Sequence, residues 1–263
     1  ARLAPHPLWQ DLVLARLQGR APAPERSARV SRCARVLEAA GEAPRAAELC
    51  ARFGSRDELA RLLEIHGLDW VERGQHANVA RWLEMARAPD EERADFHLLE
   101  GLLGARHDPG AALVALERAA LLFHRSGRHD RELATLHNIV IVAGNTGRIE
   151  QTRAAVLRLM GLRRLLTSSE ARGVALLFAG MAAFQRSRFR IARRLIDRAS
   201  AYALGPRERG AVGMGQAQLA YLDGRWKPGL EAVEVLLADP SQRRHGPSFF
   251  TLRMLRAPLA NKN

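Results

Sequence analysis

The sequence is poor in aromatic residues, cysteine and lysine, and each shortage excludes a class of protein. Aromatic residues are only 5% of the 263 residues, while alanine, leucine and arginine dominate, which favours helices over an all-β sandwich or barrel. No apolar run approaches the roughly 18 residues of a membrane-spanning helix, and the amino end lacks the apolar core of a signal peptide. The sequence therefore predicts an all-α, cytoplasmic protein without a membrane segment.

Cysteine and histidine show no metal-binding or catalytic pattern. Cys33 and Cys50 lie in helix-like stretches, without the density of a disulfide scaffold or the CxxC pairs of a zinc site, so we expect both to be packing residues. His107 and His129 each precede an aspartate at an expected turn, but no HExxH, His-x-His or Cys-His spacing occurs. The Gly-x-Ser-x-Gly elbow of hydrolases is also absent. We expect no enzyme activity, no catalytic residue, no metal site and no cofactor.

The net charge of +13, from 41 basic and 28 acidic residues, would ordinarily indicate a nucleic-acid or membrane partner. However, 39 of the basic residues are arginine, a bias that GC-rich coding explains at least as well as phosphate binding. Residues 51–100 carry 7 basic and 11 acidic side chains, a net charge of −4. Residues 151–200 carry 11 basic and 2 acidic side chains, a net charge of +9. An acidic block is thus followed by a basic one.

Turn signals recur along the chain at intervals of 33 to 40 residues. They lie at Gly41, Gly74, His107-Asp108, Gly147, Ser187 and Gly224. Helix-like stretches flank each turn, and the second helices carry apolar residues at spacings of three and four. Small or short residues, as expected where antiparallel helices approach closely, lie five positions beyond five of the turns: Ala46, Val79, Thr152, Ala192 and Gly229.

Helical hairpins of this kind bury their apolar faces by stacking on their neighbours. The period predicts about six hairpins arranged as a superhelical solenoid of antiparallel helix pairs, tetratricopeptide-like, over residues 27–240. We expect Trp70, Trp82 and Trp226, near helix ends, to fill gaps between repeats. Strand-like alternation is confined to Phe250, Leu252 and Met254.

An ordered series of motifs runs through residues 5–165. It comprises His6-Pro7-Leu8-Trp9, the stretch from Leu68 to Val71 with Gly74, the triplet Arg81-Trp82-Leu83, and the stretch from Leu98 to Phe123. In this order the motifs resemble those of MalT-like signal-transduction ATPases, which are LuxR-type transcription regulators. The resemblance implies that residues 1–26 are the end of an ATPase module, residues 27–240 a tetratricopeptide-like sensor, and residues 241–263 a tail or domain junction.

The resemblance also implies a function, namely the sensor and protein-interaction region of a bacterial transcription regulator. Such a region binds an inducer or partner protein and mediates self-association, while another domain of the parent protein contacts DNA. The chain contains no GxxxxGK[ST] loop, so the ATPase activity of the family cannot reside in it. A free-standing tetratricopeptide-type scaffold that binds a peptide in its concave groove remains the alternative.

An arginine cluster in the basic block is the candidate ligand- or partner-binding site. It comprises Arg186, Arg190, Arg193, Arg194 and Arg198. The last four recur at spacings of three and four on an expected helix over 189–203, so they share one face. That face is either an ordinary solvated surface or an anion site for a phosphorylated ligand, an acidic segment or nucleic acid.

An acidic run follows Pro89 and indicates a solvated loop and helix start rather than an acid/base pair. It comprises Asp90, Glu91, Glu92 and Asp95. Head-to-tail contact of this run with the arginine cluster would give a weak homo-oligomer that high salt dissociates, because exposed ion pairs are weak and screened. A monomer with a solvated basic face is the alternative.

Overall fold

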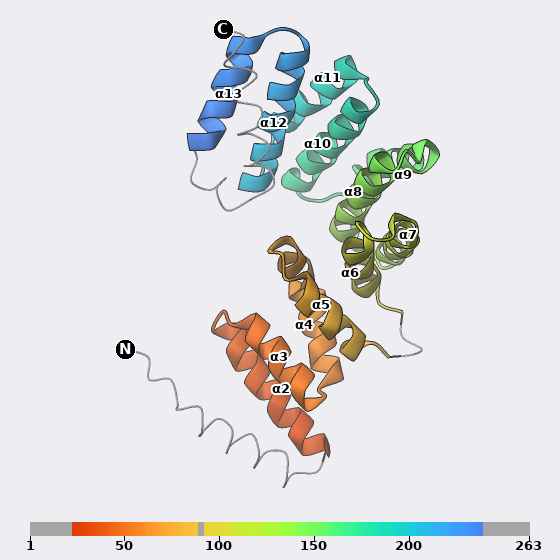
Figure 1. Cartoon of the computed structure of the whole chain (residues 1–263), viewed down its shortest axis with the longest axis vertical. Coiled ribbons are helices and arrows are strands. Elements are labelled where there is room, and N and C mark those ends of the chain that lie inside the picture. Colours follow the sequence, from red (N-terminus) through yellow and green to blue (C-terminus); the bar gives the residue numbers. More distant parts are fainter. Residues whose placement is uncertain (1–22, 89–91, 239–263) are drawn as a thin grey trace. The chain divides into compact units, whose positions relative to one another are not determined.

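The computed structural model describes residues 23–88 and 92–238 (Figure 1). These residues form twelve α-helices and no strand, so the all-α prediction is confirmed for them. The motif His6-Pro7-Leu8-Trp9, the alternation at residues 250–254 and the expected tail at 241–263 lie outside the described residues. None of the described helices combines the length and apolar character that a bilayer crossing requires.

The helices fall into two units, the first extending to Leu103 and the second beginning at Gly104. The first unit holds α2 (Ala23–Ala39), α3 (Ala43–Phe53), α4 (Arg56–Glu72), α5 (His76–Ala86) and α6 (Ala94–Gly104), whose last residue opens the second unit. Helices α2 and α3 pack together, as do α4 and α5, and α3 also contacts both α4 and α5. Helix α2 begins four residues before the predicted start of the repeats at Ser27.

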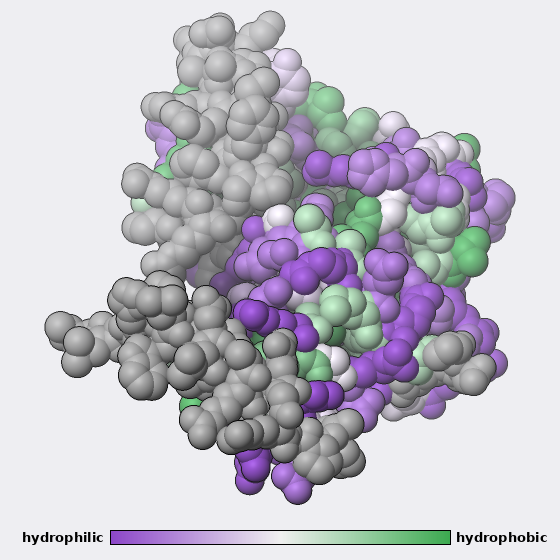
Figure 2. Space-filling view, turned by 60° about the horizontal axis from the view of Figure 1, so that its bottom comes forward, coloured by the Kyte–Doolittle hydropathy of each residue, from purple (hydrophilic) through white to green (hydrophobic). Residues whose placement is uncertain are grey.

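The second unit contains seven helices in which each helix packs on the next. They are α7 (Pro109–Arg125), α8 (His129–Asn145), α9 (Ile149–Leu162), α10 (Ser169–Gln185), α11 (Phe189–Ser200), α12 (Pro206–Leu222) and α13 (Trp226–Ala238). Helix α10 also contacts α8 and α12, so each hairpin packs against its neighbours within the unit. On the face of the molecule drawn in Figure 2, hydrophilic residues cover most of the described surface and hydrophobic residues form smaller areas between them.

All six predicted turns lie between consecutive helices. At Gly41, Gly74, Gly147 and Gly224 the backbone has a positive φ of 71–81°, the left-handed conformation that ends many helices. The residue after the glycine donates its N–H to a carbonyl five residues earlier, as in Arg148 N–H to Ala143 O at 2.8 Å. Gly54 and Gly127 mark further turns of this kind.

The small residues predicted to allow close helix approach are buried. Ala46, Val79 and Ala192 are fully inaccessible, and Thr152 and Gly229 are also buried. A larger side chain at a buried position of this kind would overpack the contact between the two helices. Burial at all five positions agrees with the expectation that small residues lie where the helices approach closely.

The turn between α10 and α11 is the exception, since Ser187 adopts a φ of +55° there without being glycine. A side chain in this conformation costs about 1–2 kcal/mol, while glycine loses more backbone entropy on folding. We expect Ser187→Gly to raise the free energy of unfolding by about 0.5–1 kcal/mol, measured by urea unfolding. Gly147→Ser, in the matching turn, is the reciprocal control and should lower it. A loss of stability in Ser187→Gly would contradict the assignment of strain to this turn.

Cys50, Trp70 and Trp82 are buried, as expected of packing residues, and Trp226 is half-buried, but the prediction for Cys33 is wrong. Cys33 is exposed on α2, because the buried stripe of that helix runs through Val30 and Ala34 and Cys33 falls beside it. Burial raises the pKa of the Cys50 thiol to about 12, which keeps it protonated and unreactive.

Candidate functional site

A groove of about 690 Å³ lies in the second unit, between the outer faces of α7 and α9. Its walls include Val114 and Leu121 from α7, Leu162 from the end of α9, and Leu165 from the turn that follows α9. Val114 is 72% exposed and Leu165 is 49% exposed, although both are apolar. Apolar side chains that line a concave surface and stay open to water are typical of ligand and partner sites.

Charged side chains lie along the same groove. Arg158 of α9 donates from Nη1 to Glu117 Oε2 of α7 at 2.7 Å, and its Nη2 lies 3.8 Å from Glu132 Oε1 of α8. Both Arg158 and Glu117 are partly exposed, whereas Glu132 is 2% exposed. A ligand in this groove would meet apolar walls together with a guanidinium and two carboxylates. The groove therefore suits an amphipathic ligand, such as a peptide segment or a small molecule with polar groups.

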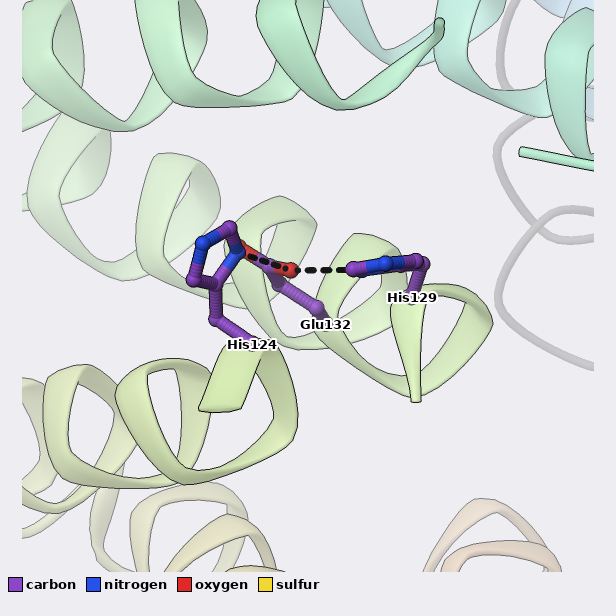
Figure 3. A group of neighbouring side chains, drawn as sticks. All are labelled: His124, His129 and Glu132. Atoms are coloured by element: carbon purple, nitrogen blue, oxygen red, sulfur yellow. Dashed lines mark hydrogen bonds and ion pairs between the residues drawn. The ribbon is translucent and has the colours of Figure 1, made fainter. Parts of the chain in front are cut away.

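His124 and Glu132 line one end of the groove, and His129 lies beside them (Figure 3). His124 Nδ1 lies 3.0 Å from Glu132 Oε2, and His129 Nδ1 lies 3.3 Å from the same oxygen. The two imidazole rings are 5.9 Å apart. Glu132 is thus a buried carboxylate held by two imidazoles and a guanidinium from three helices.

The local sequence explains this arrangement. Gly127, with a φ of +69°, turns the chain so that the last residues of α7 lie beside the first turn of α8. Glu132 is in the first turn of α8, where the free N–H groups of the helix favour a negative charge, and His124 is in the last turn of α7. The sequence signal is His124, His129 and Glu132 around a glycine turn, a spacing that matches no metal motif.

The predicted arginine cluster lies elsewhere in the second unit and does not line this groove. Arg190, Arg194 and Arg198 are exposed on α11. Arg193 is half-buried and forms an ion pair with Asp223, between α12 and α13. Arg186 is half-buried and lines a smaller pocket beside Gly147 and Gln185. The structure thus pairs one of the five arginines with a carboxylate of the same unit and leaves three exposed on α11.

The predicted acidic run is only partly described, since Asp90 and Glu91 lie outside the described residues. Asp95 is in the first turn of α6, as expected for a helix start, but it is 3% exposed rather than solvated. Its carboxylate lies near the free N–H groups of the helix end, which favour a negative charge. Because it is buried, Asp95 cannot belong to the exposed acidic run that was expected to contact the arginine cluster of another molecule.

A second charged cluster, in the first unit, joins α2 to α4. Arg61 of α4 donates to Glu58 Oε1 and to Glu38 Oε2 of α2, the latter at 2.5 Å, while His66 Nε2 lies 2.7 Å from Glu38 Oε1. The hydrogen bond from Arg61, aided by that from His66, holds the pKa of the Glu38 carboxyl below its ordinary value of 4.5 despite partial burial.

The lowered pKa gives a pH prediction with a definite sign. Because the folded pKa lies below the unfolded value, the ionised Glu38 carboxyl stabilises the fold above about pH 4.5, and this stability is lost as pH falls through the folded pKa. We expect Glu38→Gln to be less stable than the wild type at pH 7 and to show a shallower loss on acidification. Urea unfolding from pH 7 to 3 measures this, with Glu84→Gln, an exposed carboxyl on α5, as the control. Parallel curves for Glu38→Gln and the wild type would contradict it.

The chain matches no protein-family model, no curated protein and no solved structure. The features of the chain that bear on its function are the groove, the repeated hairpin turns and the ordered motifs of residues 5–165.

Proposed function

We propose that this chain is the helical-repeat sensor and protein-interaction region of a bacterial transcription regulator of the MalT-like class. In this proposal the hairpins stack as a tetratricopeptide-like superhelix. The region is not an enzyme, and it binds an inducer or partner protein inside the cell. DNA contact belongs to another domain of the parent protein.

The groove between α7 and α9 is the observation that carries the proposal. It places exposed apolar walls at Val114 and Leu165 beside the charged groups of Glu117 and Arg158, on helices whose other faces are buried in the unit. Rigid helices hold such a surface in shape, which lowers the entropic cost of binding. The recurring hairpin turns and the motif resemblance support the same assignment.

The parent gene provides the first test. The proposal predicts a nucleotide-binding loop encoded upstream of this region and a DNA-binding domain in the same polypeptide. A gene that encodes neither would overturn the regulator assignment. It would favour the free-standing scaffold that binds a peptide in its concave groove.

A groove variant provides the second test. Val114→Glu places a charge among the apolar walls, whereas Val235→Glu changes a residue of α13 that is equally exposed, at 71% against 72%. We expect Val114→Glu in the full-length protein to reduce transcription from the promoter beside its gene at least tenfold, with protein levels unchanged. Val235→Glu should match the wild type. Equal transcription in all three strains would contradict a role for the groove.

A further inference from the structure

Three groups that are common metal ligands meet at the end of the groove, two of them in its lining. A ring nitrogen of His124, a ring nitrogen of His129 and a carboxylate oxygen of Glu132 all lie within 4.8 Å of one another. Figure 3 shows both imidazoles directed toward the same carboxylate oxygen from opposite sides. The residues come from the last turn of α7 and the first turn of α8, on either side of Gly127.

The separations fit a tetrahedral ion. Zinc binds histidine nitrogen and carboxylate oxygen at about 2.0–2.2 Å, so two ligands of one tetrahedral ion lie about 3.3–3.6 Å apart. The two nitrogens lie 3.0 and 3.3 Å from Glu132 Oε2, so small side-chain movements would seat an ion between the three groups. Two imidazoles with one carboxylate form a ligand set that suits zinc and related transition metals rather than calcium or magnesium.

We propose that His124, His129 and Glu132 form a binding site for a divalent transition-metal ion of the zinc class. The Glu132 carboxylate is nearly inaccessible and lies 3.8 Å from Arg158 through its other oxygen, so its position is fixed and one oxygen is left for the ion. Arg158 is itself anchored by Glu117, which fits a supporting role outside the coordination sphere.

The site is half open. The His124 side chain is 55% exposed, and His124 and Glu132 both line the groove. With three protein ligands, the fourth coordination position is available to water or to a carboxylate of a bound molecule, an arrangement seen in zinc sites that bind substrates rather than purely structural ones. The ion would then add a strong point of attachment to the groove without changing the helical core.

The experiment uses the full chain on a Cys33→Ser background, because this exposed thiol is a competing ligand. Zinc binding is measured by competition with a chromophoric chelator. We expect one zinc per chain, and at least tenfold weaker binding in His124→Gln and in His129→Gln. His107→Gln, an exposed histidine outside the cluster, should bind as the background does. His66→Gln, which removes a single histidine paired with a glutamate, is the second control and should also leave binding unchanged.

Cobalt provides an independent readout, since tetrahedral Co²⁺ absorbs visible light far more strongly than six-coordinate Co²⁺. We expect this absorption in the background protein and its loss in His124→Gln, a change at a half-exposed side chain that leaves the helices folded by circular dichroism. Zinc affinity that is equal in all five proteins would overturn the proposal, as would zinc binding only at millimolar concentration. Zinc competition and cobalt absorption do not depend on the proposed regulatory function. The metal site can therefore be disproved without affecting the regulator assignment, and the regulator assignment can be disproved without affecting the metal site.

Discussion

Trp82→Ala is expected to lower the free energy of unfolding of the first unit by about 3–5 kcal/mol. The indole is 2% exposed and lies in the unit's main hydrophobic core, with its ring 5.1 Å from that of Trp70 in an edge-to-face contact. Its Nε1 donates to Glu48 Oε2 at 3.2 Å, which joins α5 to α3. Truncation would therefore remove packing, an aromatic contact and a hydrogen bond that ties two helices together.

Arg81→Ala is the matched control, because Arg81 precedes Trp82 and contacts the same Glu48 carboxylate from a more exposed position. An exposed ion pair contributes only about 0–1 kcal/mol, so this variant should unfold almost as the wild type does. Urea unfolding followed by circular dichroism measures both, and the two units should be fitted as separate transitions. If the variants lose equal stability, Trp82 is not a core residue of the first unit.

The backbone features of this fold were the most predictable from sequence. Four of the six predicted turns follow a local rule, because glycine adopts a positive φ at little cost, and the helix that follows must approach its partner within a few residues. Ala46 and Ala192 obey the second rule as clearly as Gly41 and Gly147 obey the first. Local chemistry of this kind can be read without knowledge of the whole structure.

The orientation of individual side chains was less predictable. Cys33 is one position away from the buried residue Ala34, and a helix turns by about 100° between neighbours, so a small error in the assumed face reverses burial. Asp95, in the first turn of α6, is buried although it belongs to a charged run, so the polarity of its neighbours in sequence did not indicate its burial.

The candidate site could not be predicted because it forms only when helices pack. Val114 of α7 and Leu165, just after α9, are distant in sequence but line the same groove. Helices α7 and α9 both pack on α8, and α9 also contacts α10. His124, His129 and Glu132 lie close in sequence, yet their spacing resembles no known motif, since the glycine turn interrupts the helical register. Predicting this cluster would require the relative placement of α7 and α8 across the Gly127 turn, which the sequence does not specify.

Ala192→Phe is expected to lower the free energy of unfolding of the second unit by roughly 1–3 kcal/mol, because it overpacks the contact between α10 and α11. Ala192 is fully buried, and Gly180 faces it from α10. A Cβ atom at Gly180 would lie 3.3 Å from the Ala192 carbonyl oxygen and 2.7 Å from Ile196 Cγ1. Ile191→Phe, beside Ala192 but half-exposed, is the control and should change stability little. An unchanged melting temperature in Ala192→Phe would show that α11 packs elsewhere.

Replacing a glycine by alanine is expected to change stability in opposite directions at Gly180 and at Gly161. Gly180→Ala adds a methyl group against the backbone of α11, so we expect a loss of stability that outweighs the gain in helix propensity. Gly161→Ala, in α9, adds the same methyl group where nothing lies within 4 Å, so propensity alone acts and stability should rise by up to about 1 kcal/mol. Thermal unfolding of both variants measures the difference. A gain in both would mean that α10 and α11 are not in backbone contact at Gly180, because only that contact distinguishes the two substitutions.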